Sequence, residues 1–170
     1  MKTIISPLKS IAIFSLIAFI LVLFGCKPGL LPSTNITATP ENRRIVTFLE
    51  QYKAASEKRS VDALMELVAK DFKDNAGSED PAVHLDYLSL KEKLEKIMPR
   101  IKDLRLGLFI QHVQRLEKDT YEVVFYFTKH ILMEVPAGEK WFSVKEVNRM
   151  LIRRRHDSSS PYEFEILQGI

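Results

Sequence analysis

Beyond the first forty residues, apolar side chains recur at every third or fourth position, which is the spacing of one buried helix face. Thr39 and Pro40 are typical of the N-cap and the first position of a helix. Ser60 is typical of the N-cap of a second helix, which carries its own apolar stripe. A capping box beginning at Ser89 opens a third helix, which Pro99 ends. The first stripe contains Ile45, Phe48, Leu49, Tyr52 and Ala55, and the second contains Val61, Leu64, Met65 and Val68. The pattern therefore predicts three helices.

In the second half of the chain the apolar period falls to two, which is typical of strands. Leu104, Leu106, Leu108 and Ile110 form one alternating run, and Tyr121, Val123, Phe125 and Phe127 form the next. Trp141–Arg154 and Tyr162–Leu167 complete a set of four strands, and Phe72 marks an additional short one. We therefore predict an α+β fold in which three N-terminal helices pack on a curved, four-stranded antiparallel sheet with a cone-like shape. Gly107 is predicted to mark a bulge that lets the sheet bend.

The N-terminus has the anatomy of an export signal. Lys2 and Lys9 precede an almost entirely apolar run over residues 11–24, as in a bacterial signal peptide. The run ends in Leu23-Phe24-Gly25-Cys26, which resembles the lipobox of bacterial lipoproteins, apart from Phe24 where a small residue is usual. That resemblance implies cleavage before Cys26 and lipid attachment to its sulfur. Lys27 stands where many inner-membrane lipoproteins have an aspartate, so the same resemblance implies the outer membrane, facing the periplasm.

Three regions follow from these patterns. Residues 1–25 are predicted to be a lipoprotein signal peptide, and residues 26–39 the lipidated cysteine with a flexible tether rich in Pro, Ser and Thr. Residues 40–170 are predicted to be one folded domain. The membrane, reached through lipid on Cys26, is thus the first expected partner.

Composition limits the other partners. The 170 residues are 46% hydrophobic and 28% charged, which suits a globular domain. The net charge is +3, but removing Lys2 and Lys9 leaves 23 basic against 22 acidic residues, or +1. Because nucleic-acid binding depends on neutralising phosphates, we expect no nucleic-acid partner. The single cysteine excludes an internal disulfide.

The element order also resembles a known superfamily. The words carrying the resemblance are residues 48–55 (FLEQYKAA), 60–67 (SVDALMEL), 71–74 (DFKD) and the stretch from 148–150 (NRM) to 165–169 (EILQG). Together they resemble the nuclear transport factor 2-like (NTF2-like) superfamily, which includes ketosteroid isomerase, scytalone dehydratase and polyketide cyclases. The resemblance implies a pocket between the helices and the concave sheet face, and a homodimer paired through the sheet.

Candidate catalytic residues follow from the same resemblance. Tyr52 falls where the isomerase has a helix-one tyrosine, and Asp74 falls near the loop of its catalytic aspartate. A dehydratase-like site would instead use His84 with Asp86 and Tyr87. The alternative interpretation is that Tyr52 is a core aromatic, Asp74 caps a turn, and Asp86-Tyr87 begins a helix.

Aromatic residues give the candidates for ligand binding. Tyr52, Phe109, Tyr126 and Trp141 either line a cavity or fill the core. The four histidines show no short metal-binding spacing, so we expect neither a metal site nor a cofactor.

A basic stretch ends the third strand. Arg153 and Arg155 are predicted to lie on one side of it and Arg154 on the other. This stretch either meets anionic lipid head groups or forms ion pairs with the nearby Glu163 and Glu165.

The leading functional hypothesis is a lipid-anchored, non-catalytic periplasmic domain that binds a small apolar ligand or an envelope protein. The alternative is an isomerase- or dehydratase-like enzyme that uses a pocket carboxylate. A third hypothesis, a structural role in an envelope assembly, predicts an apolar, solvent-facing patch on the sheet.

Overall fold

The computed structural model describes residues 29–75, 80, 83–157 and 160–170; the predicted signal peptide and Cys26 lie outside these residues. Helix α2 (Pro40–Glu57) begins at Thr39, whose hydroxyl accepts a hydrogen bond of 3.1 Å from the N–H of Asn42. Helix α3 (Val61–Glu66) begins at Ser60, whose hydroxyl accepts the N–H of Ala63. Both predicted helix starts are confirmed. In the part of the chain that the structure describes, no helix is long and apolar enough to span a membrane.

Helix α4 (Tyr87–Ile97) begins earlier than the capping box at Ser89 predicts. Its N-cap is Asp86, whose carboxylate accepts the N–H of Ser89 at 2.8 Å, while the Ser89 hydroxyl accepts the N–H of Asp86 at 2.8 Å. Asp and Ser are equally good N-caps, and this reciprocal pair satisfies two free donors at once. A short 3₁₀ helix, η2 (Met98–Arg100), follows and holds Pro99.

Four strands form one antiparallel sheet in the order β3-β4-β5-β6. These strands are β3 (Ile101–Arg115), β4 (Thr120–Val135), β5 (Gly138–Arg154) and β6 (Phe164–Gln168). A separate two-stranded pair joins β1 (Lys73–Asp74) to β2 (Leu85–Asp86). The α+β fold with an open four-stranded antiparallel sheet is therefore confirmed, and the doubly apolar strand β4 lies in its interior.

The predicted bulge at Gly107 is wrong. Gly107 pairs in register with Thr128, and the register of β3 shifts at two other places, between Ile101 and Asp103 and between Ile110 and His112. Gly107 instead borders a hollow on the outer face of the sheet. A Cβ at this position would make an ordinary contact of 3.7 Å with the Thr128 Cβ. A strand glycine by itself does not decide whether the ladder bulges.

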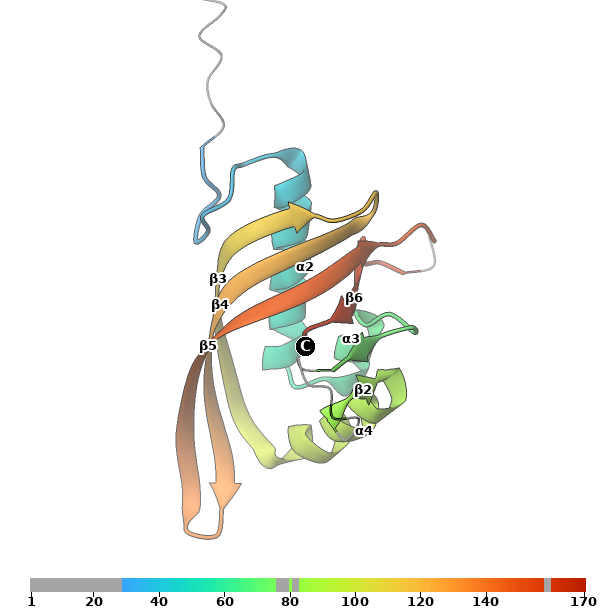
Figure 1. The fold of residues 1–170 in the computed structure, drawn as a ribbon. Coiled ribbons are helices and arrows are strands. Elements are labelled where there is room, and N and C mark those ends of the chain that lie inside the picture. The colour runs from blue at the N-terminus through green and yellow to red at the C-terminus, as the bar shows by residue number, and fades with distance from the viewer. Residues whose placement is uncertain (1–28, 76–79, 81–82, 158–159) are drawn as a thin grey trace, which may run out of the picture.

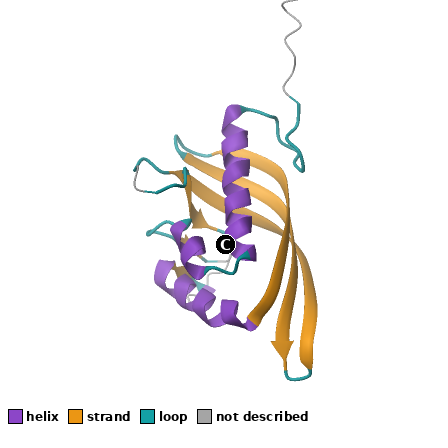
Figure 2. Ribbon diagram, turned by 180° about the vertical axis from the view of Figure 1, so that it is seen from behind, coloured by secondary structure: helices purple, strands orange, loops and turns teal. Residues whose placement is uncertain are grey.

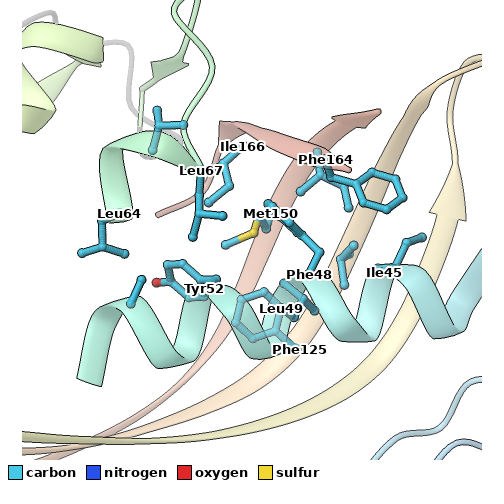
Figure 3. Close-up of a cluster of buried hydrophobic side chains, with 14 of the residues drawn as sticks. Ile45, Phe48, Leu49, Tyr52, Leu64, Leu67, Phe125, Met150, Phe164 and Ile166 are labelled. Carbon is cyan, nitrogen blue, oxygen red and sulfur yellow. The ribbon is translucent and has the colours of Figure 1, made fainter. Parts of the chain in front are cut away.

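The concave face of the sheet carries the core. Figure 2 shows α2 lying along this face, with α3 and α4 at one end and the β4–β5 hairpin reaching beyond them. Figure 1 shows the same hairpin extending past the start of β3. Phe48 of α2 lies 5.8 Å from Phe164 between ring centres, and Tyr121 meets the same ring edge-on. Figure 3 shows Phe48, Leu49 and Tyr52 of α2 packed with Met150, Phe164 and Ile166 of the sheet.

The segment before α2 differs from the expected flexible tether. Leu31 and Ile36 are buried in the core, and a backbone hydrogen bond of 2.9 Å joins them. The N–H of Asn35 donates to the carbonyl of Ile110 in β3 at 2.8 Å. Turn-forming residues thus shape a compact loop between two apolar anchors, because burying those side chains outweighs the flexibility of the Pro- and Ser-rich sequence.

Candidate functional site

A cavity of about 240 Å³ lies between α2, α4 and the inner face of the sheet. Its lining is mainly apolar: Leu64, Leu85, Leu90, Leu94, Ile97, Met98, Ile101, Leu104, Leu106, Phe127, Ile131 and Ile170. The polar members among the described residues are Tyr52, Ser56, Lys93 and Lys129. An apolar cavity with a few polar groups is the usual form of a small-molecule site.

Helical and strand periodicity position these side chains. Tyr52 and Ser56 lie one turn apart on α2, and Leu90 and Leu94 lie one turn apart on α4, so each pair shares a helix face. The inward-facing residues of β3 and β4 form the opposite wall. Figure 2 shows α4 standing at the open end of the curved sheet, and the cavity lies where α4, the last turns of α2 and the sheet meet.

Tyr52 is the one sequence-predicted residue that lines this cavity. It is buried, and burial raises the pKa of its phenol to about 12, although the neighbouring Ser56 hydroxyl opposes that rise. The hydroxyl therefore stays protonated at neutral pH and can donate a hydrogen bond. Ser56 in turn donates to the carbonyl of Tyr52 at 2.9 Å.

Lys129 is the cavity residue that sequence reasoning missed. Its ammonium lies 4.3 Å from the centre of the Phe127 ring. Burial lowers the pKa of this ammonium and nearby Lys93 lowers it further, whereas Glu146 raises it. The sequence did contain a signal for this residue. The odd-numbered positions of β4 face inward and are otherwise apolar, and Lys129 is the charged residue among them.

Asp74 and His84 line a different hollow, of about 800 Å³, on the surface beside the β1–β2 pair. Asp74 accepts a hydrogen bond of 3.1 Å from the N–H of Gly169. Leu85 borders both this hollow and the cavity. The structure thus brings Asp74 and His84 together but separates both from Tyr52, so the predicted residues do not share one cavity.

Asp86 and Tyr87 begin helix α4, as the alternative interpretation of that pair predicted. The Asp86 carboxylate caps the helix, and its hydrogen bonds to Ser89 lower the pKa of that carboxyl. The Tyr87 hydroxyl accepts a hydrogen bond of 2.6 Å from Lys70. The Asp86 side chain therefore caps the helix, and it also borders the surface hollow that Asp74 and His84 line.

The other aromatic candidates lie elsewhere. Phe109 and Tyr126 are partners in the β3–β4 register on the outer face of the sheet, and both are exposed. Trp141 is also exposed, with the Arg105 guanidinium 5.1 Å from its ring. These three side chains line neither the cavity nor the core. A shallow hollow on the outer face is bordered by Phe109 and Tyr126.

The arginines at the end of β5 form ion pairs with acidic side chains. Arg153 contacts Glu165 at 2.6 Å and Asp71 at 2.9 Å, and Arg154 contacts Glu163 at 3.3 Å. The sequence-based interpretation of these arginines as paired with nearby acids is therefore confirmed. Among the described residues, no group of three or more His, Cys, Asp or Glu side chains could hold a metal ion.

Comparison with known proteins gives the fold class. No protein-family model and no curated protein matches the chain. Among solved structures, a conserved protein from Planctomyces limnophilus is 11% identical, with a TM-score of 0.61 over 76% of this chain and 92% of its own. A presumed dehydratase of the NTF2-like family from Streptomyces avermitilis is 17% identical, with a TM-score of 0.57 over 77% of this chain and 95% of its own.

A third neighbour carries no activity in its name. It is an NTF2-like protein of unknown function from Shewanella oneidensis, 16% identical, with a TM-score of 0.54 over 76% of this chain and 96% of its own. The chain therefore has the NTF2-like fold, as its element order predicted. At these identities the likeness concerns the fold alone, because one fold hosts many unrelated activities.

Proposed function

We propose that this protein is an envelope lipoprotein whose NTF2-like domain binds a small apolar ligand in the cavity between α2, α4 and the sheet. The observation that carries the proposal is the cavity itself, whose lining is mainly apolar. Its volume of about 240 Å³ lies just below the range of about 300–1,000 Å³ typical of drug-sized ligands, which favours a small occupant.

The arrangement of the N-terminal segment supports a close attachment to the membrane. If lipid is carried by Cys26, only residues 27–29 separate it from the loop that packs on β3. Three extended residues reach at most about 11 Å. The domain would therefore lie against the membrane surface, which we propose to be the outer membrane on its periplasmic side.

A binding role is favoured over catalysis by the placement of the acidic groups. The isomerase- or dehydratase-like alternative needs a carboxylate in the same cavity as Tyr52. Among the described residues, none of the side chains lining that cavity is an Asp or a Glu. Asp74, the candidate base, borders the separate surface hollow.

Photolabelling tests the proposal on the full chain in lipid nanodiscs. A neutral alkyl diazirine should label residues lining the cavity, read out by mass spectrometry of peptides. Leu94→Trp fills the cavity from α4 and should abolish this labelling. Leu88→Trp is the matched control, because Leu88 lies on the same helix and is 68% exposed. Labelling confined to the outer surface, or equal in both variants, would contradict the proposal.

A second surface supports self-association. Phe109, Tyr126 and Val147 are register partners on adjacent strands and form an exposed apolar row across the outer face. Exposed apolar rows of this kind are typical of protein interfaces. We propose that this row pairs with a second copy of the chain, and an envelope protein is the alternative occupant.

A further inference from the structure

The cavity contains two cations, and neither forms an ion pair with an acidic side chain among the described residues. Lys129 lies on its inner wall and Lys93 at its edge on α4. Neither forms an ion pair with the residues that the structure describes, whereas Lys91 and Lys96 on the same helix pair with Glu95 and Glu92. The two cavity lysines thus differ from their neighbours in having no acidic partner.

The lack of an ion-pair partner matters most for Lys129, because of where this residue lies. Its register partners on the inner face are Leu106 and Val144, so it is flanked by apolar side chains. Its one close contact that compensates the charge is with the Phe127 ring. A partly buried ammonium beside apolar groups loses part of its hydration free energy, which an ion pair with good geometry recovers. Glu146, which faces the inner side of β5 opposite Phe127, raises the pKa of Lys129, but it is exposed and forms no ion pair with Lys129.

We infer that the ligand of this cavity is a small amphiphilic monocarboxylate, whose apolar body fills the cavity and whose carboxylate lies between Lys129 and Lys93. This inference rests on the proposed function and narrows it to a ligand class. The polar groups suit a carboxylate because they are donors: two ammonium groups and the protonated Tyr52 hydroxyl. A cationic ligand would meet two like charges, and a neutral one would leave the Lys129 charge unbalanced.

The volume sets the size of that acid. A cavity of about 240 Å³ accommodates a medium-length alkyl chain or one substituted aromatic ring. Phe142, a partly exposed residue on the inner face of β5 and the register partner of the lining residue Ile131, continues the lining outwards. A longer chain could therefore extend along Phe142 without changing how its carboxylate is held.

The test compares three probes of the same shape and different charge. Octanoate, octanamide and octylamine are titrated calorimetrically into the full chain in phosphatidylcholine nanodiscs, and empty nanodiscs are subtracted. Replacing a neutral hydrogen bond with a charge-assisted one strengthens binding by roughly 1.4 kcal/mol, or about tenfold. We therefore expect octanoate to bind about tenfold more tightly than octanamide, and octylamine to bind most weakly.

Substitutions of Lys129 test whether this residue causes the preference for octanoate over octanamide. Lys129→Met keeps the side-chain length and removes the charge, so octanoate affinity should fall about tenfold while octanamide affinity changes little. Lys129→Arg should retain the preference for octanoate. Lys145→Met is the matched control, because Lys145 lies on the outer face of β5, and it should alter neither affinity. A cooperative thermal transition in circular dichroism establishes that each variant is folded.

The outcomes separate the two claims. Equal affinity of the wild-type chain for octanoate and octanamide would overturn the ligand class and leave the apolar binding function intact. An equal loss of both affinities in Lys129→Met would overturn it as well. If none of the three probes bound, and the neutral diazirine also failed to label the cavity, the proposed function itself would fall.

Discussion

The backbone N–H of Asn35 donates a hydrogen bond of 2.8 Å to the carbonyl oxygen of Ile110, and so joins the N-terminal segment to strand β3. Thr34 lies in a parallel bridge with the same residue. On either side of this contact, Leu31 and Ile36 are buried. The segment that leads towards Cys26 is thus part of the folded domain, which fixes the face of the domain from which a lipid anchor would extend.

Truncating one of the buried anchors should destabilise the domain. Ile36→Ala removes buried methylene and methyl groups, and we expect it to lower the free energy of unfolding by about 2–4 kcal/mol in urea denaturation. Leu30→Ala is the matched control, since Leu30 is 64% exposed, and should stay within about 0.5 kcal/mol of wild type. Equal effects of the two substitutions would mean that the segment does not pack on β3 in solution.

Lipid attachment is tested at Cys26 itself. Intact mass spectrometry of the membrane-extracted protein should give a chain that begins at Cys26 and carries acyl groups. Cys26→Ser removes the thiol that would receive the lipid, so the variant should keep its first 25 residues and lack the added mass. An unlipidated, unprocessed wild-type chain would refute both the anchor and the cleavage site.

The buried phenol of Tyr52 predicts a specific alkaline instability. Its pKa is about 12 in the folded chain and about 10 when exposed, so the contribution to stability is complete below pH 10 and is lost as the pH rises towards 12. Two pKa units correspond to about 2–3 kcal/mol. Tyr52→Phe should therefore lose less stability than wild type between those pH values, as measured by chemical denaturation.

The exposed Tyr126 provides the comparison for this measurement. Tyr126→Phe should retain the wild-type loss of stability over the same pH range. If the Tyr52→Phe and Tyr126→Phe profiles coincided, the Tyr52 hydroxyl would not be buried as the structure places it.

Arg153 joins β5 to β6 and to the chain before β1 through Glu165 and Asp71. Arg153→Met leaves the poorly exposed Glu165 carboxylate with one partner fewer, and we expect a loss of about 1–3 kcal/mol at pH 7. The Arg153 guanidinium also holds the pKa of Asp71 below its usual value. That part of the loss is present above the unfolded pKa of Asp and disappears as the pH falls through the folded one.

Arg149→Met is the control for this ion pair, because Arg149 is on the same strand, 73% exposed, and paired with Glu122 at 3.4 Å. Such exposed pairs contribute about 0–1 kcal/mol, so this variant should remain close to wild type. Denaturation at pH 7 and pH 3 distinguishes the two variants. A loss for Arg149→Met as large as for Arg153→Met would show that the Glu165 and Asp71 contacts have no special role.

Self-association through the outer face is tested at Val147, which is 61% exposed in the middle of the apolar row. Val147→Glu should shift the protein from dimer to monomer in light scattering after gel filtration, because a carboxylate buried at such an interface lacks a partner. Leu88→Glu changes a similarly exposed apolar residue on α4 and should leave the dimer unchanged. A monomeric wild-type chain would rule out this interface.

The sequence by itself determined the type and order of the elements. Helix starts at Thr39 and Ser60 depend on hydrogen bonds to residues three positions away, and strand alternation is equally local. The sequence also allowed the pairing of Arg153 with a nearby acid to be predicted, because alternation along two neighbouring strands places such side chains on the same face. Because the type and order of the elements are encoded locally, the NTF2-like fold could be predicted from element order.

Only the tertiary structure decided which side chains share a cavity. Tyr52 and Lys129 line one cavity because α2 lies along the concave face of the sheet. Asp74 lies outside it, because it pairs with β2 and accepts a hydrogen bond from Gly169 after β6. The docking of Ile36 on the core likewise depends on residues far along the chain. Such contacts are set by the curvature of the whole sheet, and no local pattern of polar and apolar residues encodes that curvature.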